Sequence, residues 1–183
     1  DIRGGGMFSG RMTTVLVAAG AVLRDFISAY GISVGSYTTS IGSVKDDTVY
    51  SADEIMQISH TNPLRAMTSE MEEAMREEIL KAKADGDSVG GVIRCVAKGL
   101  PAGLGEPFFD TLDGEIAKAV FAIPGVKGIE FGAGFAAASL RGSENNDSYL
   151  MQDGVVSTKT NNAGGILGGM SNGAALEFSV AFK

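Results

Sequence analysis

An α+β fold is predicted for this chain because helical and strand-like patterns are mixed along it without a regular β-α-β rhythm. Helical periodicity marks residues 12–30, 69–84 and 110–121, whereas strand-like composition marks the stretches between and after them. With 183 residues, the chain has the size of one domain that can bury a core. We therefore expect a single domain over residues 1–183.

The first predicted helix, residues 12–30, is apolar or small at almost every position. Val15, Leu16, Val22 and Phe26 fall on more than one face of a helix, which is typical of a buried helix. Gly31 is a suitable C-terminal cap. We expect this helix in the core of the fold.

Residues 32–44 predict one strand or a strand pair by their β-branched content. Residues 45–62 are polar, and we expect them to be irregular, with a short helical turn that starts at Ser51 or Asp53.

The helix predicted over residues 69–84 has a clear start and one apolar side. Ser69 and Glu72 have the spacing of a capping box, and Glu77 and Lys81 have that of an ion pair one turn apart. The apolar side chains form one stripe: Met71, Met75, Ile79 and Ala82. This pattern indicates a structural helix with one solvated face.

The second half of the chain predicts a strand over 89–97, then a helix capped by Asp110 with Leu112, Ile116 and Val120 facing inward. Further strands are expected over 126–131, 136–140 and 174–182. The stretch 142–161 is rich in Ser, Asn and Asp, and we expect it to be a mobile loop.

Composition excludes several classes of protein. A net charge of −7 argues against a nucleic-acid binder, because neutralising phosphates needs a basic face. The single cysteine, Cys95, rules out an internal disulfide; we expect a core thiol and a cytoplasmic protein. Apolar runs stay below membrane-spanning length, and the first residues lack a signal-peptide layout, so no membrane partner is expected.

Two glycine-rich stretches are the candidate binding features. Residues 3–11 (RGGGMFSGR) hold three glycines between two arginines and lead into a helix start, an arrangement that suits an anionic, partly planar ligand. Residues 162–173 form the second stretch. A flexible loop that enters a helix explains the first stretch equally well.

Other candidate sites are weaker. The lone histidine, His60, is expected on the surface of a polar loop, and the sequence shows no metal-ligand spacing and no phosphate-binding loop. Glu106 and Asp110 could form a carboxylate dyad of a hydrolase, although helix capping explains Asp110 without it.

Five ordered motifs resemble those of chorismate synthase. They are residues 3–11 followed by VAAGA at 17–21, GLPAGLGEP at 99–107, VKGIEFG at 126–132, RGSE at 141–144 and NAGGILGGMSNG at 162–173. The resemblance implies a β-α-β sandwich with central helices between antiparallel sheets. It also implies conversion of 5-enolpyruvylshikimate 3-phosphate to chorismate by 1,4-elimination of phosphate, with reduced FMN and no net redox change.

The family's site residues carry over onto matching positions. The resemblance assigns flavin contacts to Met7, Phe8, Ser9, Pro124, Gly125, Gly168 and Lys183, and assigns Arg11 to the anionic substrate. Relatives often have arginine where Met7 stands. The bare backbone at the opening glycines and at 164–169 would then face the isoalloxazine and the phosphate.

The resemblance also limits the expectation. The family's two catalytic histidines belong to motifs upstream of Arg3, and its Lys-Pro-Thr and Arg-His-Asp-Pro motifs lie downstream, so no catalytic residue is expected in this chain. We expect a central fragment that is inactive alone, from a family of homotetramers. The alternative is a non-catalytic, glycine-rich assembly module derived from the same fold.

Overall fold

A five-stranded antiparallel sheet is the centre of the computed structural model, which describes residues 4–58, 62–152 and 154–183. The strand order is β2-β1-β3-β9-β4. The strands are β1 (Ser33–Ile41), β2 (Val44–Lys45), β3 (Gly91–Lys98), β4 (Val126–Phe131) and β9 (Leu176–Phe182). The predicted α+β class is confirmed, as are the strands expected near 89–97, 126–131 and 174–182.

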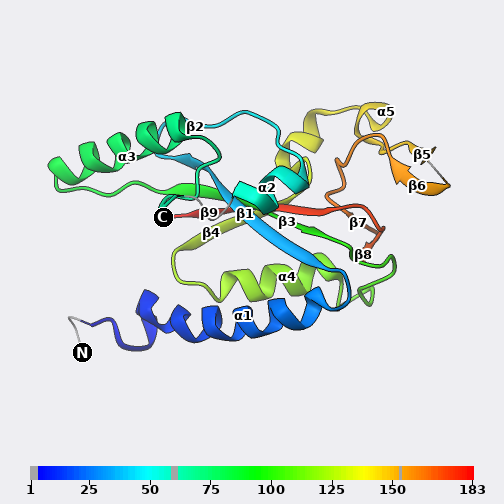
Figure 1. Cartoon of the computed structure of the whole chain (residues 1–183), viewed down its shortest axis with the longest axis horizontal. Helices are drawn as coiled ribbons and strands as arrows, with labels where there is room; N and C mark the ends of the chain where they lie inside the picture. The colour runs from blue at the N-terminus through cyan, green and yellow to red at the C-terminus, as the bar shows by residue number, and fades with distance from the viewer. Residues whose placement is uncertain (1–3, 59–61, 153) are drawn as a thin grey trace.

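Helices lie on both sides of this sheet. In the view of Figure 1, α1 (Thr13–Ser28) and α4 (Leu112–Phe121) lie below it, and α2 (Ala52–Ile58) and α3 (Ser69–Ala84) lie above it and beyond the β2 edge. Of the two predicted starts, Ser51 and Asp53, the structure shows Ser51: its hydroxyl accepts a hydrogen bond from Glu54 N at 3.3 Å, and its own N–H donates to the Glu54 carboxylate at 2.7 Å. Reciprocal bonds of this kind satisfy two otherwise unpaired donors at a helix start.

The best-packed core lies on the α2 side. Tyr37, Ile55, Met67 and Val96 form one buried cluster, with exposed fractions between 1% and 5%. Met75 of α3 is fully buried at 0% exposure. A second cluster, on the α4 side, consists of Ala97, Ile166 and Leu176 with Leu112 and Ile116 packed against it.

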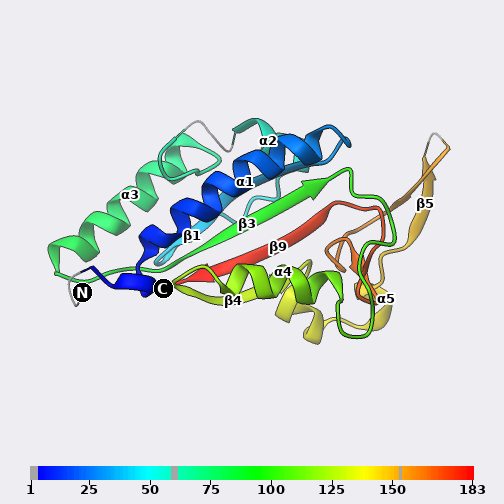
Figure 2. The same cartoon turned by 90° about the horizontal axis from the view of Figure 1, so that it is seen from below.

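The predicted burial of the first helix is wrong for this chain. The helix itself is present as α1, but none of its residues is buried: Val22 is 71% exposed and Phe26 is 60% exposed. The reason is that α1 packs on the sheet along one side only. In the ranges that the structure describes, no element covers its other side (Figure 2).

Two predicted helix caps are shifted by one residue. Thr68, rather than Ser69, caps α3, because its hydroxyl accepts a hydrogen bond from Met71 N at 3.2 Å. Thr111, rather than Asp110, caps α4 by accepting from Gly114 N at 3.3 Å. In both cases the threonine has the extended backbone that places its hydroxyl over the first turn.

The ion pair on α3 is also displaced. Glu72 pairs with Arg76, whereas the structure shows no pair between Glu77 and Lys81, both of which it describes.

Residues 136–140 are not a strand, contrary to prediction. Residues 136–139 belong to the 3-10 helix η3 (Gly134–Ser139), and Leu140 caps it by donating its N–H to Ala137 O at 3.1 Å. The segment therefore makes its bonds within itself and packs against the preceding strand β4 without pairing to it.

The segment 142–161 contains regular structure. It holds the short helix α5 (Gly142–Asn145) and an antiparallel hairpin of β5 (Tyr149–Gln152) and β6 (Val155–Thr158) that extends away from the body in Figure 2. Asp147 closes its base by accepting bonds from Thr160 Oγ1, Asn162 N and Ala163 N at 2.6–2.8 Å. Partial burial opposes ionisation, but these bonds hold the pKa of Asp147 below its usual value. Mobility of this segment stays a prediction.

Candidate functional site

The opening glycine-rich loop folds into two short 3-10 turns before α1. They are η1 (Gly6–Phe8) and η2 (Gly10–Met12). Ser9 lies between them and caps η2, with its hydroxyl accepting a bond from Arg11 N at 3.3 Å. The Arg11 guanidinium donates to Gly4 O at 2.8 Å, which fastens the loop to itself. The loop is thus a defined turn with an exposed arginine.

The loop exposes bare backbone at Gly6 beside an exposed side chain at Met7. Gly6 has a φ of +50°, and a Cβ built on it would meet nothing within 4 Å. Met7, which follows it, is 77% exposed. A positive φ explains why glycine is needed at position 6, and the open space leaves bare peptide available to a flat group.

Lys183 joins two parts of the predicted site. Its N–H donates to Gly125 O at 2.9 Å, in the turn between α4 and β4, and its ammonium donates to Ser88 O at 2.9 Å. Figure 2 shows the loop that precedes α1, the C-terminus and this turn at the same end of the sheet. Gly125 and Lys183 are therefore in direct contact, whereas Figure 1 draws the N-terminal loop at the same end of the sheet but well below the C-terminus.

Gly168 is not at that end of the sheet. It lies in the turn between β7 (Ile166–Leu167) and β8 (Met170–Ser171), at the opposite end of the sheet in Figure 1. The neighbouring Gly169 accepts a bond from Leu112 N at the start of α4, whereas Gly125 follows the end of that helix. The two places are separated by about 15 Å, the length of a ten-residue helix. The flavin contact of Gly168 remains a prediction.

Most of the second glycine cluster serves packing within the chain. A Cβ on Gly164 would lie 2.4 Å from Gly132 N, one on Gly165 would lie 2.5 Å from Ala175 O, and one on Gly169 would lie 2.5 Å from Thr111 Cγ2. Among the glycines of residues 164–169 only Gly168 faces open space, because a Cβ there would meet nothing within 4 Å. Close internal packing therefore explains the other glycines, and Gly168 alone is available to a ligand.

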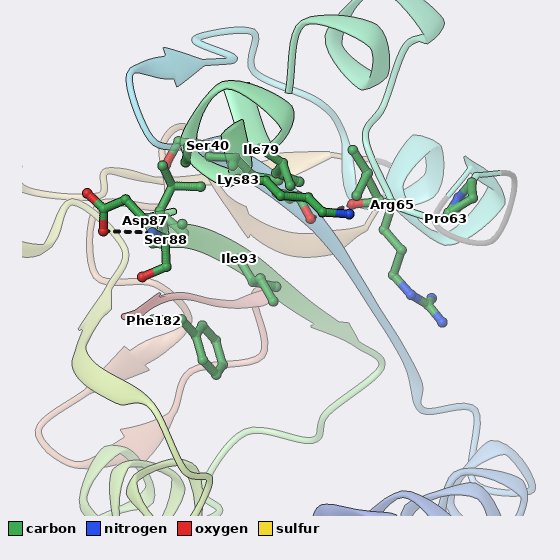
Figure 3. Close-up of a pocket in the computed structure, with 17 residues that line it drawn as sticks. Ser40, Pro63, Arg65, Ile79, Lys83, Asp87, Ser88, Ile93 and Phe182 are labelled. Carbon is green, nitrogen blue, oxygen red and sulfur yellow. Dashed lines mark hydrogen bonds between the residues drawn. The ribbon is translucent and has the colours of Figure 1, made fainter. Parts of the chain in front are cut away.

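A cavity of about 600 Å³ lies beside the same end of the sheet as Lys183, between α3 and the strands β1, β3 and β9. Figure 3 shows Ile79 of α3 above it and Ile93 and Phe182 of the sheet below, with Lys83 reaching across from α3. Sequence reasoning missed this cavity. One available signal was the spacing of Ile79 and Lys83, which are four residues apart and therefore share a face of α3.

The remaining candidates gain no support from their surroundings. Glu106 and Asp110 pair through main-chain bonds of 2.8 and 3.0 Å, and neither residue is buried, so they do not form a buried carboxylate pair. His60 lies outside the described residues. Cys95 is partly buried and not a member of the core clusters, and this burial raises the pKa of its thiol to about 11.

Two further findings concern the described ranges. They contain no cluster of three or more His, Cys, Asp or Glu side chains arranged to hold a metal ion. Nor do they contain a helix with the length and apolar character needed to cross a membrane.

Comparison with known proteins decides the family. The family model described as chorismate synthase matches residues 1–183. The chain belongs to the chorismate synthase family. The chorismate synthase of Dehalococcoides mccartyi strain BAV1 is 48% identical over 186 residues, and that of Methanosarcina mazei is 46% identical over 183 residues. Each alignment covers all of this chain and 50% of the relative.

A solved structure of chorismate synthase has the same fold. It superposes with a TM-score of 0.90 at 33% identity and covers 96% of this chain and 56% of the solved chain. The fold predicted from the motifs is therefore confirmed as chorismate synthase-like. The chain spans about half the length of the curated relatives that it matches.

Proposed function

We propose that this chain forms the flavin-facing part of an enzyme that converts 5-enolpyruvylshikimate 3-phosphate to chorismate. The reaction breaks the C3–O bond to phosphate and removes a proton from C6, so a double bond forms and no net oxidation occurs. Membership of the chorismate synthase family supports this proposal. The observation that carries it is the bond between Lys183 N and Gly125 O, which joins two predicted flavin contacts.

The residues at the Lys183 end of the sheet fit a reduced FMN. Bound FMN would supply electron density as the carbon–oxygen bond breaks. Met7, Phe8, Ser9, Pro124 and Gly125 would hold it mainly through backbone, for which the open space at Gly6 is suited. Lys183 would place a cation beside the cofactor, and Gly168 would contribute from the β7–β8 turn.

Arg11 would bind the phosphorylated substrate. Its bond to Gly4 O uses one N–H group and fixes the guanidinium at the mouth of the loop, which leaves its other donors for an anion. A guanidinium pairs well with phosphate and carboxylate oxygens because its donors lie in a planar fork.

We further propose that the 183-residue chain alone does not convert the substrate, since the proton donors and acceptors of the family are expected in segments that it does not include. A cytoplasmic location and a homotetramer remain part of the same proposal.

A second candidate function, a non-catalytic assembly module, is favoured by the exposed apolar side of α1, where Val22 is 71% and Leu23 59% exposed. Such a module would leave the fluorescence of FMN unchanged, whereas a flavin-binding chain would quench it.

The test combines phosphate release with flavin binding. Phosphate release from 5-enolpyruvylshikimate 3-phosphate with reduced FMN is measured on this chain and on one of the full-length relatives; we expect turnover only in the latter. FMN fluorescence is then titrated with this chain and with Lys183→Ala, and Lys127→Ala of the exposed part of β4 serves as the control. We expect Lys183→Ala to weaken binding about fivefold. Equal affinities for the two variants would contradict the flavin assignment, and turnover by this chain at the full-length rate would contradict the fragment proposal.

A further inference from the structure

The cavity between α3 and the sheet has the features of a separate small-molecule site. Its volume of about 600 Å³ falls within the range of about 300–1,000 Å³ that small-molecule pockets occupy. Its lining includes none of the residues predicted to contact the flavin or the substrate. Two lining residues adjoin the predicted flavin contact Lys183: Phe182 precedes it in the chain, and Ser88 O accepts a bond from its ammonium.

The walls of the cavity are fixed before any ligand binds. Loop residues 62–66 are fastened to themselves by Asn62, which bonds to both Ala66 N and Ala66 O, at 3.0 and 2.7 Å. The same loop is fastened to β1, because Thr38 N donates to Arg65 O at 3.0 Å and Thr38 Oγ1 donates to Leu64 O at 2.6 Å. On the other wall, the fully buried Met75 anchors α3. A preformed pocket lowers the cost of ordering on binding.

The cavity has a positively charged side chain at one end and a negatively charged one at the other. Lys83 makes no hydrogen bond or ion pair within the described residues, and in Figure 3 its side chain extends from α3 toward Arg65, a second cation that lines the cavity. Asp87 lies at the opposite end in the same view, and its carboxylate accepts a bond from Ser88 N at 2.7 Å. A ligand with one negative charge at the Lys83 end would therefore be attracted, and a second negative charge near Asp87 would be repelled.

We propose that this cavity binds a small amphipathic monoanion, an apolar ring or branched chain that carries a single carboxylate. Lys83 pairs with the carboxylate, and Ile79, Ile93 and Phe182 contact the apolar part. This inference does not depend on the proposed elimination reaction.

The experiment uses 2-naphthoate as the probe and the neutral 2-naphthamide as its isostere, each titrated into the 183-residue chain by fluorescence. Lys83→Met should weaken naphthoate about fivefold, the upper range for a solvent-accessible ion pair, and leave naphthamide unchanged. Lys81→Met removes a charge from the same helix outside the cavity, and it should change neither affinity.

A second pair of variants tests the apolar contacts. Ile79→Ala should weaken both probes, whereas Leu80→Ala, on the exposed side of α3, should weaken neither. Equal effects of Lys83→Met and Lys81→Met on naphthoate would overturn the proposal. So would loss of naphthamide binding in Lys83→Met, or displacement of naphthoate by FMN, which would show that the cavity belongs to the flavin site.

Discussion

The two sides of the central sheet differ in how far their apolar side chains are buried. On the α2 side, Ile55 is 1% exposed and Val96 is 1% exposed, in a core closed by α2 and the segment before α3. On the other side, Val22 and Phe26 of α1 remain 71% and 60% exposed, although α1 is more apolar than α3 (Figures 1 and 2).

The difference shows that a helix's burial depends on the elements available to cover it. Half of the residues of α3 are charged, yet the helix buries Met75 completely because β1 and β2 lie against it. The α1 helix has a sheet on one side and nothing on the other among the described residues. An apolar helix is therefore buried only where other elements of the fold pack against it.

The largest expected effect concerns the closed core. Ile55→Ala should lower the free energy of unfolding by about 2–4 kcal/mol, because it leaves a cavity that fixed neighbours cannot fill. Val22→Ala in α1 should change it by less than about 0.5 kcal/mol. Urea denaturation followed by circular dichroism measures both. Similar losses for the two variants would mean that α1 is covered in solution.

The second prediction uses Cys95 of β3, which lies opposite Ser36 of β1 in the sheet register, on the side that faces α1. Ser36 lines a groove together with Leu23 and Ile27 of α1. Burial raises the pKa of this thiol to about 11, so at pH 8 almost none of it is thiolate. Labelling with a thiol-specific disulfide reagent should be about a hundredfold slower in the native chain than in the urea-unfolded chain. Rapid labelling of the folded chain would show that α1 lifts from the sheet.

The third prediction tests the cap of α3, the helix on the closed side. Thr68→Ala should cost about 1 kcal/mol of stability, because Met71 N loses its acceptor. Ser69→Ala should change stability by only a few tenths of a kcal/mol, since Ser69 lies within the helix and not at its cap. Thermal or urea unfolding compares the stability losses of the two variants. A larger loss in Ser69→Ala would mean that Ser69 caps the helix, as the sequence predicted.

The smallest effect on stability is expected for Val22→Glu, at less than about 0.5 kcal/mol. Its effect should be seen in self-association, because it places a charge in the exposed apolar side of α1. Val49→Glu, at a loop residue that is 93% exposed, is the matched control. Sedimentation velocity at rising concentration should show less association for Val22→Glu only; equal behaviour of both variants would mean that the α1 side is not the associating surface.

Local patterns predicted most of the regular elements. The strand over 126–131 has the bounds expected, and the helix at 69–84 is predictable from one apolar stripe, because its periodicity comes from residues within the element itself. The caps at Thr68 and Thr111 differ from prediction by one residue, since two adjacent side chains could each act as a cap and only the backbone angles choose between them.

Predictions of the site were uneven for a related reason. The motif resemblance named Gly125 and Lys183, which are 58 positions apart in sequence and directly hydrogen-bonded in the structure. It also grouped residues 164–169 as one ligand-facing stretch. The structure divides that stretch, because Gly164 and Gly165 approach other backbone segments and Gly168 does not.

By itself, the sequence determined the family, the α+β class and most elements, because motifs, caps and periodicity are written in neighbouring residues. The tertiary structure alone decided three things: that α1 keeps one apolar side exposed, that Gly168 lies a helix length from Gly125, and that Lys83 lines a largely apolar cavity. Each depends on contacts between segments far apart in the chain, and local sequence patterns do not predict which distant segments come into contact.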